Sequence, residues 1–456
     1  MHRTITTDAD VRRAFARDAS GLELMPDAVA RPTSVEEVQE LLREATATRT
    51  AVTPAGAQSS TTGASIVDHG LLLSLRNLAA IAPVDTDART IRVGAGALVA
   101  DVRRAAEAAG LLFTPDPTSE EECTIGGAIA CNASGARSLR YGATGPQVRA
   151  LTVLLADGER LDLRRPALEK NTVGYPVAHD PVDWFIGSEG TLGVVVDAEL
   201  ALHPLPVQVI GLVVPFVQEA DALAFVVAAR RAPGLHPRCL EFFDRGAMEI
   251  ARAAEGSSAW ATAATAMVYL EETGDADGEL PLDAWLALAE AHHALADDIR
   301  VYDTPTAQQE ARRMRHAVPA TMNERGAARR PVGGRKVSTD WAVPYPRLAE
   351  ALTIARRHAD DAGIDRGIAY GHAGNGHPHQ NFIAQDADDL HRIEQVVQAT
   401  LRDVIAMGGT VAAEHGIGKL KRRWLPMQAS AMQQRVMHAL KREMDPLGLL
   451  APGNVL

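Results

Sequence analysis

Residues 114–147 constrain the fold of this chain more than any other stretch, because they are crowded with small residues such as Gly126, Gly127, Ala130 and Gly135. Glycine loses more conformational entropy on folding than any other residue, so such a cluster indicates that something approaches the main chain closely. The pair Gly126–Gly127 can offer consecutive N–H groups to an anion. The stretch lacks the G-x-G-x-x-G motif of dinucleotide-binding βαβ units. A glycine-rich surface loop is the alternative interpretation.

Two further loops of small residues flank this stretch along the chain. Residues 54–63 follow a short apolar run, and residues 186–193 lead into a strand-like segment at 194–202. In this order, the three segments resemble the FAD-binding domain of the vanillyl-alcohol oxidase flavoprotein superfamily, over about residues 26–205. The resemblance implies that the first loop wraps the pyrophosphate, the long stretch lines the flavin and ribityl chain, and the third loop supports the adenine side. The family's Arg-Gly-x-Gly-Thr-Ser is replaced in the first loop by residues 55–60, Ala-Gly-Ala-Gln-Ser-Ser.

The resemblance also implies which residues contact the cofactor. The FAD-binding positions expected from it are Pro54, Ala55, Gly56, Ala57, Gln58, Ser59, Ser60, Gly63, Pro115, Asp116, Thr118, Thr124, Ile125, Gly126, Gly127, Asn132, Ser134, Gly135, Tyr141, Gly142, Glu189, Gly190, Gly193 and Val194. Covalent members of the superfamily use a histidine or cysteine beside the flavin, and the first loop contains neither. We therefore expect non-covalent FAD, with Cys131 as the nearby candidate for a covalent link.

Composition excludes several classes of function. The net charge of −12 argues against a nucleic-acid partner, whose footprint would be basic. Three cysteines without a C-x-x-C motif exclude a four-cysteine iron–sulfur cluster and a disulfide framework. No window approaches 18 uncharged apolar residues, so we expect no membrane span. These features favour a cytoplasmic protein, with peripheral membrane attachment as a variant; a homodimer is compatible with them.

The predicted fold class is α+β, in two domains and a tail. Residues 1–205 form the expected two-subdomain FAD-binding domain, and the glycine-rich character stops near Pro204–Pro206. Residues 206–406 alternate strand-like runs (208–216, 266–271) with alanine-rich helices (217–231, 281–297, 304–325, 346–362). By resemblance this second region is a ferredoxin-like substrate-binding cap. The tail, residues 407–456, is expected to pack back on the FAD domain.

Residues 370–381 hold three histidines separated by glycines, His372, His377 and His379. Imidazoles on a turn can converge on one metal that a distant carboxylate completes, such as Glu414. A hydrogen-bonded structural cluster is the alternative. The stretch resembles the D-2-hydroxy-acid dehydrogenase branch of the superfamily (D-lactate, D-2-hydroxyglutarate and glycolate dehydrogenases), where His-x-Gly-Asp-x-x-x-His and a later Glu-His hold zinc or manganese and supply a base.

That resemblance assigns roles to individual residues. His372, His379 and Glu414 become metal ligands, His415 the catalytic base, and Asn381 a substrate contact, with His377 expected beside the metal. Asn375 stands where the family most often has Asp. Residues 310–325 resemble the substrate-arginine helix, where Arg315 is the best match; Lys336 is the second candidate cation. Arginine suits this role because its guanidinium binds carboxylate in a bidentate way. Arg312 and Arg313 are expected at the surface.

The implied reaction is oxidation of a D-lactate-like 2-hydroxy acid to its 2-keto acid, assisted by a metal, with hydride transfer to flavin N5. Because the chain has no iron–sulfur or haem motif, the electrons must pass to an external acceptor: a quinone, a cytochrome or an electron-transfer protein. Alternatives remain. A sugar or aldonolactone oxidase, or a relative of alkyl-glycerone-phosphate synthase, would not need the histidine cluster. A glycolate oxidase-type subunit would mainly dock partners, and a flavin-free binding protein would be colourless.

Overall fold

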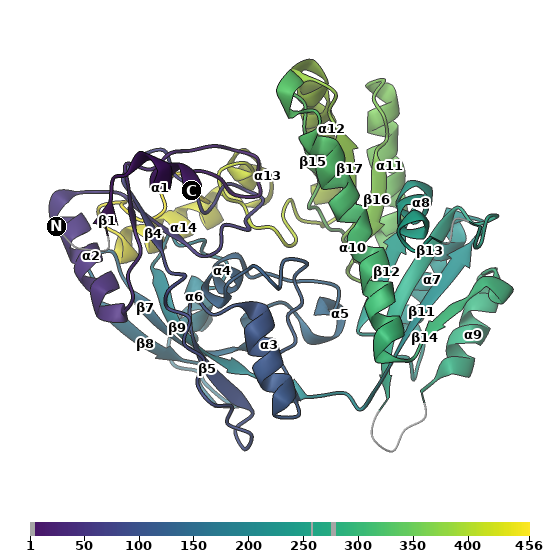
Figure 1. The fold of residues 1–456 in the computed structure, drawn as a ribbon, viewed down its shortest axis with the longest axis horizontal. Coiled ribbons are helices and arrows are strands. Elements are labelled where there is room, and N and C mark those ends of the chain that lie inside the picture. Colours follow the sequence, from purple (N-terminus) through teal and green to yellow (C-terminus); the bar gives the residue numbers. More distant parts are fainter. Residues whose placement is uncertain (1–4, 257–258, 275–279) are drawn as a thin grey trace. The chain divides into compact units, whose positions relative to one another are not determined.

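The computed structural model describes residues 5–256, 259–274 and 280–456, and the chain divides into two compact units (Figure 1). The first unit contains Met1–Gly135, Gly142–Leu205 and Glu414–Leu456; the second contains Ala136–Tyr141 and Pro206–Ala413. Both units combine helices with largely antiparallel or mixed sheets, so the predicted α+β class is confirmed.

The first unit is built on two four-stranded sheets. The mixed sheet has the order β1-β2-β4-β3, with β2 and β3 both parallel to β4. The second sheet is antiparallel, in the order β5-β9-β7-β8. The strands are β1 (Ile5–Thr6), β2 (Ala28–Ala30), β3 (Val52–Ala55), β4 (Leu71–Ser74), β5 (Thr90–Gly94), β7 (Val148–Leu154), β8 (Arg160–Arg164) and β9 (Val194–Ala201), with a small β6 (Leu111–Leu112) and β10 (His203–Pro204) pair.

In the first unit, side-chain hydrogen bonds help to set where helices begin. The longest are α2 (Val35–Thr48), α3 (Val99–Ala108) and α14 (Ala431–Met444); the shorter ones are α1 (Ala9–Ala14), α4 (Ile125–Cys131), α6 (Val182–Phe185) and α13 (Leu425–Gln428). Helix α2 starts at Ser34, whose hydroxyl accepts the N–H of Glu37, and its apolar face joins the core over the mixed sheet. The chain therefore begins this helix directly after a capping serine.

Helix α4 lies inside the glycine-rich stretch and packs tightly against residues 95–97. The N–H of Ile125 donates to Ala97 O and that of Gly126 to Ala95 O, both at 2.8 Å. The N–H of Gly127 lies 3.3 Å from Thr124 Oγ1. The expectation that Gly126 and Gly127 present two N–H groups to an anion is therefore wrong, because protein oxygens already accept both. Gly126 is small for another reason: a Cβ there would lie 2.8 Å from Ala95 Cβ.

The second unit is built on one seven-stranded antiparallel sheet with the order β14-β11-β13-β12-β16-β17-β15. Its strands are β11 (Gln208–Phe216), β12 (Cys239–Phe243), β13 (Ala266–Gly274), β14 (Arg300–Tyr302), β15 (Lys336–Ser338), β16 (Ile368–Gly371) and β17 (His379–Ile383). The helices are α5 (Ser138–Tyr141), α7 (Glu219–Arg231), α8 (Arg245–Ala254), α9 (Leu282–Ala291), α10 (Pro305–Ala327), α11 (Leu348–Asp361) and α12 (Ala387–Ala406).

One face of this sheet is covered by α8 and α10. Apolar residues of both helices share a buried core with side chains such as Val213, Phe243 and Tyr370 from the strands. Helix α10 contacts both edge strands, β14 and β15, and so crosses the whole sheet (Figure 1). Helices α7 and α9 lie on the other face, where Phe225 packs against Phe216 and Trp285. Residues that point toward α10 are therefore brought together from several strands.

The structure corrects two boundaries in the predicted domain division. Residues 136–141, assigned from the sequence to the FAD-binding domain, belong to the second unit, because Arg137 pairs with the buried Glu271. Tyr141, an expected cofactor contact, ends this segment. The C-terminal part of the first unit begins at Glu414 and not at residue 407, since Thr410 pairs through its backbone with Ala342.

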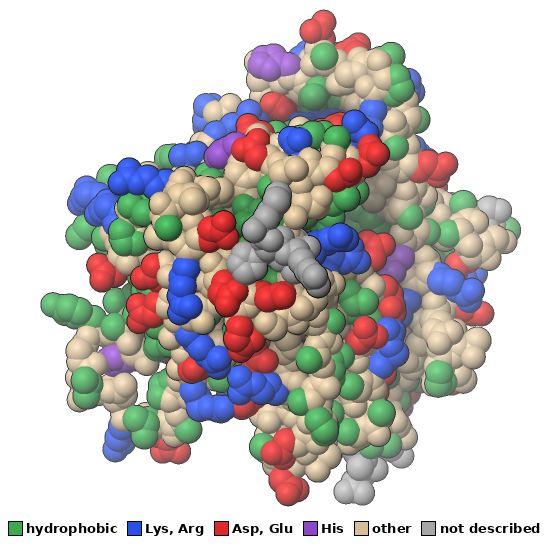
Figure 2. Space-filling view, turned by 60° about the vertical axis from the view of Figure 1, so that its left-hand side comes forward, with side chains coloured by type: hydrophobic (Ala, Val, Ile, Leu, Met, Phe, Trp, Pro, Cys, Tyr) green, Lys and Arg blue, Asp and Glu red, His purple; other side chains and the backbone are tan. Residues whose placement is uncertain are grey.

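The surface carries both signs of charge. On the face drawn in Figure 2, acidic and basic side chains are interspersed, as a net charge of −12 with 46 basic residues leads one to expect. Among the described residues, none of the helices is both long and apolar enough to cross a bilayer.

The packing of α4 predicts opposite effects for two neighbouring glycines. Gly126→Ala would press its methyl group against Ala95 and cost about 1–3 kcal/mol of stability, partly offset by up to about 1 kcal/mol of helix propensity. Gly127→Ala meets only Thr124 Oγ1 at 3.3 Å. We expect a lower thermal unfolding midpoint for Gly126→Ala and an equal or higher one for Gly127→Ala. Equal destabilisation of both variants would contradict this account of α4.

Candidate active site

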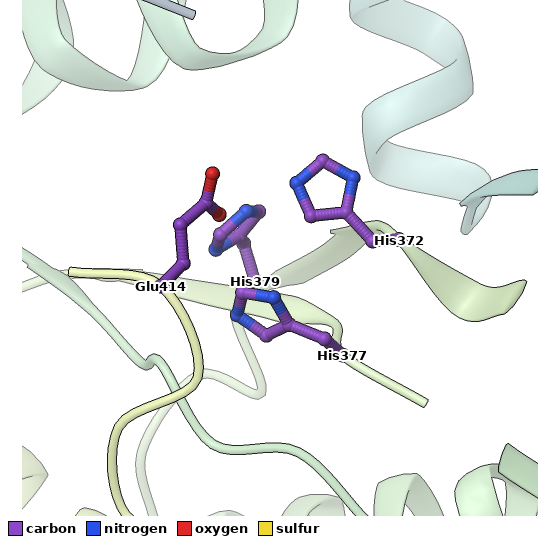
Figure 3. Close-up of side chains that lie close together, drawn as sticks. All are labelled: His372, His377, His379 and Glu414. Carbon is purple, nitrogen blue, oxygen red and sulfur yellow. The ribbon is translucent and has the colours of Figure 1, made fainter. Parts of the chain in front are cut away.

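Three histidines and one glutamate form a cluster that could hold a metal ion. His372, His377, His379 and Glu414 each offer one ligand atom, and these atoms all lie within 4.8 Å of one another (Figure 3). His372 and His377 are buried, and the other two are half-buried. The sequence predicted His372, His379 and Glu414 here; the structure adds His377, which was expected only beside the site.

The turn between β16 and β17 creates this cluster. The strands pair so that Tyr370 lies opposite His379, and the connecting residues close with His377 N–H donating to His372 O at 3.1 Å. Gly371 and Gly376 adopt positive φ values of 122° and 70°, which glycine tolerates best. Asn375 contributes its backbone N–H to His372 O at 2.9 Å, so its place in this turn does not depend on an acidic side chain.

The residue that precedes Glu414 is held within the second unit. This residue is Ala413, and its backbone N–H donates to Asp340 O at 2.8 Å. Asp340 in turn follows Thr339, whose N–H donates to Gln380 O on β17 at 2.9 Å. The start of the Glu414 segment is thus tied to the strand that begins at His379. His415 follows as a half-buried residue.

Glu241 on β12 links the cluster to the predicted substrate arginine. Its Oε1 lies 2.7 Å from His372 Nδ1, and its Oε2 accepts from Arg315 Nε at 3.0 Å. Glu241 is only 1% exposed. If His372 donates its Nδ1–H to this carboxylate, the Nε2 lone pair is left to face a metal, the usual arrangement behind a metal-ligating histidine.

Sequence reasoning missed Glu241, although a signal was present. The residue stands between Leu240 and Phe242 in a short apolar run, and a buried strand rarely carries a carboxylate unless it is paired. Its partners come from α10 and from the turn after β16, which lie 74 and 131 residues away along the chain. Only the sheet register makes them neighbours.

Arg315 and Asn381 lie on the cluster's side of the sheet, and Lys336 lies further along the sheet. Asn381 is fully buried two residues after His379; its Nδ2 donates to His379 O, and its Oδ1 has no hydrogen-bond partner among the described residues. Lys336 pairs with Ile383, four residues beyond His379. At about 3.3 Å per residue, this places it roughly 13 Å further along the strand.

Lys336 is nevertheless an unusual cation. Burial lowers the pKa of its ammonium to about 8. Its Nζ donates to Asn323 Oδ1 at 2.6 Å, a neutral acceptor that does not offset the charge. A nearby anion would therefore stabilise the protonated form.

In the first unit, the three small-residue loops converge. A Cβ on Gly56 would collide with Thr124 of the second loop, and one on Gly190 would lie 2.5 Å from Pro54 Cγ. The N–H of Glu189 donates to Ala130 O at 2.9 Å. Each loop therefore limits the space around the next, and larger side chains at these glycines would separate them.

Three expected cofactor contacts have left-handed backbones although they are not glycine. They are Gln58 (φ 60°), Asn132 (φ 49°) and Glu189 (φ 51°), one from each loop. Such conformations cost energy in most residues and concentrate at ligand sites. Tertiary contacts hold them here: for example, Asn132 Oδ1 accepts the N–H of Gly145 at 2.9 Å.

The exposed side of α4 fits a flat aromatic group. Ile125, Ala128 and Ile129 are buried in the core, so the partly accessible residues are Gly126, Gly127, Ala130 and Cys131, none with a long side chain. A planar ring system can approach such a surface closely. Although Cys131 is partly accessible, desolvation by the surrounding protein raises the pKa of its thiol to about 12, which disfavours the thiolate needed for a covalent link.

Glu189 joins the third loop to the segment that follows His415. Its two carboxylate oxygens accept the N–H groups of Ile417 and Gly418 at 2.6 and 2.7 Å. Burial raises the pKa of this carboxyl, and the two backbone donors oppose the shift. Gly416 is required beside it, since a Cβ there would lie 2.6 Å from Glu189 Oε1.

The donor set is chemically suited to a divalent metal. Zinc binds imidazole nitrogen and carboxylate oxygen at about 2.0–2.2 Å, which requires its ligand atoms to lie roughly 3–4 Å apart. The separations here, up to 4.8 Å, need only small side-chain movements. The carboxylate behind His372 adds the outer contact that such sites usually have. The residues therefore fit a metal of this kind.

Comparisons with known proteins identify the family. Residues 26–164 match the model of the FAD binding domain, and residues 206–455 match that of the C-terminal domain of FAD linked oxidases. The second match covers more than half of the chain. The chain therefore belongs to the FAD-linked oxidases of the vanillyl-alcohol oxidase superfamily, and it is an FAD-dependent oxidoreductase.

Several curated relatives resemble the whole chain. A D-2-hydroxyglutarate dehydrogenase of Xanthomonas citri is 34% identical, covering 94% of this chain and 89% of the relative. The glycolate oxidase subunit GlcD of Bacillus subtilis is 30% identical (97% and 92%), and a D-lactate dehydrogenase of Anaerostipes hadrus 29% (98% and 93%). A solved alkyldihydroxyacetonephosphate synthase has the same fold, with a TM-score of 0.73 at 18% identity over 98% of this chain and 83% of that chain.

Glu241 provides a test of how the site is organised. Glu241→Gln keeps the shape but removes the charge that faces both Arg315 and His372, so one amide N–H must point at a donor. We expect metal affinity to fall by about 10–100-fold, the usual effect of losing such an outer contact, together with a lower unfolding midpoint. Titration with zinc or manganese would measure the affinity.

A matched control is Glu255→Gln, because Glu255 also pairs with an arginine, Arg300, and lies away from the histidines. It should lower stability without changing metal affinity. Unchanged metal affinity in Glu241→Gln would contradict the link between Glu241 and His372.

Proposed function

We propose that this enzyme oxidises a D-2-hydroxy acid to the 2-keto acid at a metal-assisted site and passes the electrons to an external acceptor. The observation that carries the proposal is the arrangement around Glu241, where one buried carboxylate orients both His372 and Arg315. A 2-hydroxy acid offers the matching groups, a carboxylate and an adjacent hydroxyl. Relatives named for D-lactate, D-2-hydroxyglutarate and glycolate support the substrate class.

Arg315 is the group best placed to bind the substrate carboxylate. Its side chain is 13% exposed, and its Nε is used by Glu241, which fixes the plane of the guanidinium. Guanidinium groups bind carboxylates through paired N–H donors, so a fixed plane sets the orientation of the acid. Asn381, whose buried Oδ1 has no hydrogen-bond partner among the described residues, can accept from a substrate hydroxyl.

In this proposal, each catalytic group has one role. A divalent metal, zinc or manganese, would be held by His372, His379 and Glu414 and would lower the pKa of the substrate hydroxyl. His415 removes the hydroxyl proton as general base. Non-covalently bound FAD would supply the hydride acceptor, chemistry that belongs to the cofactor. The reduced enzyme would be reoxidised by a quinone, a cytochrome or an electron-transfer protein, and we place the enzyme in the cytoplasm.

A second candidate is a glycolate oxidase-type subunit that works inside a multi-protein complex, favoured by the 30% identity to GlcD. Such a subunit, purified alone, would reduce artificial electron acceptors poorly. The proposed dehydrogenase would reduce them well with a D-2-hydroxy acid present. Comparing the two activities separates the candidates.

The direct experiment is anaerobic mixing of the FAD-loaded protein with a panel of D- and L-2-hydroxy acids. Loss of flavin absorbance near 450 nm with D acids, and not with their L isomers, is the expected result. Bleaching with sugars or aldonolactones only would contradict the proposal and support the oxidase alternative.

The adjacent residues Glu414 and His415 should have separable roles. His415→Ala should keep metal and FAD while lowering the rate of flavin reduction by about 10²–10⁴-fold, the range typical of a positioned general base. Glu414→Ala should instead lose the metal. Metal analysis and stopped-flow reduction of each variant check this. A His415→Ala variant that reduces its flavin at the wild-type rate would place the base elsewhere.

Lys336 predicts a dependence on both pH and substrate length. Because it lies well along the sheet from His379, we expect it to affect dicarboxylic acids such as 2-hydroxyglutarate and not lactate. Its ammonium is charged below its pKa of about 8, so KM for the dicarboxylate should rise as pH increases through about 8. In Lys336→Arg, whose guanidinium stays charged, this rise should disappear. The same pH profile in wild type and Lys336→Arg would exclude the role.

A further inference from the structure

His377 lies within the cluster, about as close to the other two imidazoles as they lie to each other. Its ring centroid is 4.5 Å from that of His379 and 5.4 Å from that of His372, and the residue is 4% exposed. Figure 3 shows the three imidazoles and the Glu414 carboxylate gathered around one space. The position is thus geometrically equivalent to that of the two predicted histidine ligands.

A buried carboxylate stands behind His377, as one does behind His372. Asp340 Oδ1 lies 3.3 Å from His377 Nε2, and the Asp340 side chain is fully buried. Glu241 faces His372 Nδ1 more closely, as a hydrogen bond of 2.7 Å, whereas the Asp340 contact is longer than a well-formed hydrogen bond. A carboxylate against one ring nitrogen selects the tautomer that leaves the other nitrogen to bind a metal. Two of the three histidines therefore carry this arrangement.

Asp340 is also fixed by neighbours that matter to the cluster. Its backbone oxygen accepts the N–H of Ala413, the residue before Glu414, at 2.8 Å. Thr339, directly before it, is hydrogen-bonded to Gln380, the residue after His379. Asp340 thus faces His377 and holds the start of the Glu414 segment, while Thr339 beside it joins both to the strand of His379. A histidine that only filled space would not need this support.

We propose that His377 is a fourth protein ligand of the metal and that Asp340 is its positioning residue. This inference rests on the proposed function and goes beyond the His-x-Gly-Asp-x-x-x-His pattern, which does not include this position. The chain has Asn375 where that pattern has an acid. The turn therefore offers the His377 imidazole as an extra neutral nitrogen ligand and offers no carboxylate.

The types of ligand atom predict which metals this site would prefer. Three imidazoles and one carboxylate favour first-row transition metals, whereas magnesium and calcium prefer oxygen ligands. We therefore expect zinc, manganese or cobalt to bind, with no displacement by a large excess of magnesium or calcium. If all four residues bind the metal, substrate oxygens can also bind it only when the metal accepts more than four ligands.

The test compares His377→Asn with wild type, using metal binding and not turnover as the readout. The cobalt-loaded proteins are examined by visible absorption and X-ray absorption spectroscopy. We expect three imidazoles around cobalt in wild type and two in His377→Asn, with an affinity at least about 10-fold weaker. Asp340→Asn should keep three imidazoles but bind about 10–100-fold more weakly.

His358→Asn is the matched control, because His358 also faces a carboxylate, Asp403, at 2.6 Å, on helices α11 and α12. It should leave the cobalt spectrum unchanged. Only two imidazoles around cobalt in the wild-type protein would overturn the inference while leaving the proposed function intact. This count is made on the wild-type protein, so it does not depend on whether a variant folds. A wild-type protein that binds no metal would overturn both.

Discussion

The buried carboxylate of Glu241 is the interaction on which the candidate site depends. An isolated carboxylate is strongly destabilised in a protein interior, and a charged partner with good geometry is needed to offset that cost. Arg315 supplies the charge and His372 a second hydrogen bond, at 3.0 and 2.7 Å. Removing one partner of such a pair typically costs about 3–5 kcal/mol, so all three groups are held together. The same carboxylate therefore positions both the proposed substrate arginine and the proposed metal ligand His372.

Two other buried carboxylates organise the rest of the chain, by different means. Burial opposes ionisation of Glu271, but Arg137 and Arg238 outweigh it and hold its pKa well below the usual range. Through Arg137, this ion pair anchors residues 136–141 in the second unit. Glu189 has backbone N–H partners instead of a cation, and its pKa is raised. It anchors the residues after His415 to the third small-residue loop of the same unit.

Much of this organisation was predictable from local sequence. Glycine clustering picked out three loops that the structure brings together, and helical periodicity located α7, α10 and α11 to within a few residues. Helix α9 was predicted too long: it ends at Ala291, because His293 adopts a left-handed backbone. The histidine turn was visible because its residues are close in sequence. Local patterns carry this information because helices, turns and loops depend on neighbours along the chain.

What the sequence could not show depends on strand register and long-range pairing. Glu241 and Asp340 are ordinary acids until the pairing of β12 with β16 and of β15 with β17 brings them behind His372 and His377. The sequence marks Lys336 as a candidate second cation for the substrate. Only the sheet register shows that its pairing with Ile383 places it further along the strand from His379. The N–H of Gly126 was lost to the distant acceptor Ala95 O for the same reason.

The central claim is that this enzyme holds a metal between the histidine turn and Glu414. Crystals grown with FAD and zinc or manganese, measured at the absorption edge of the added metal, test it most directly. The account predicts one strong anomalous peak at about 2.0–2.3 Å from nitrogen atoms of His372 and His379 and from a Glu414 oxygen. An anomalous map without a peak there, from protein with FAD bound, would contradict it.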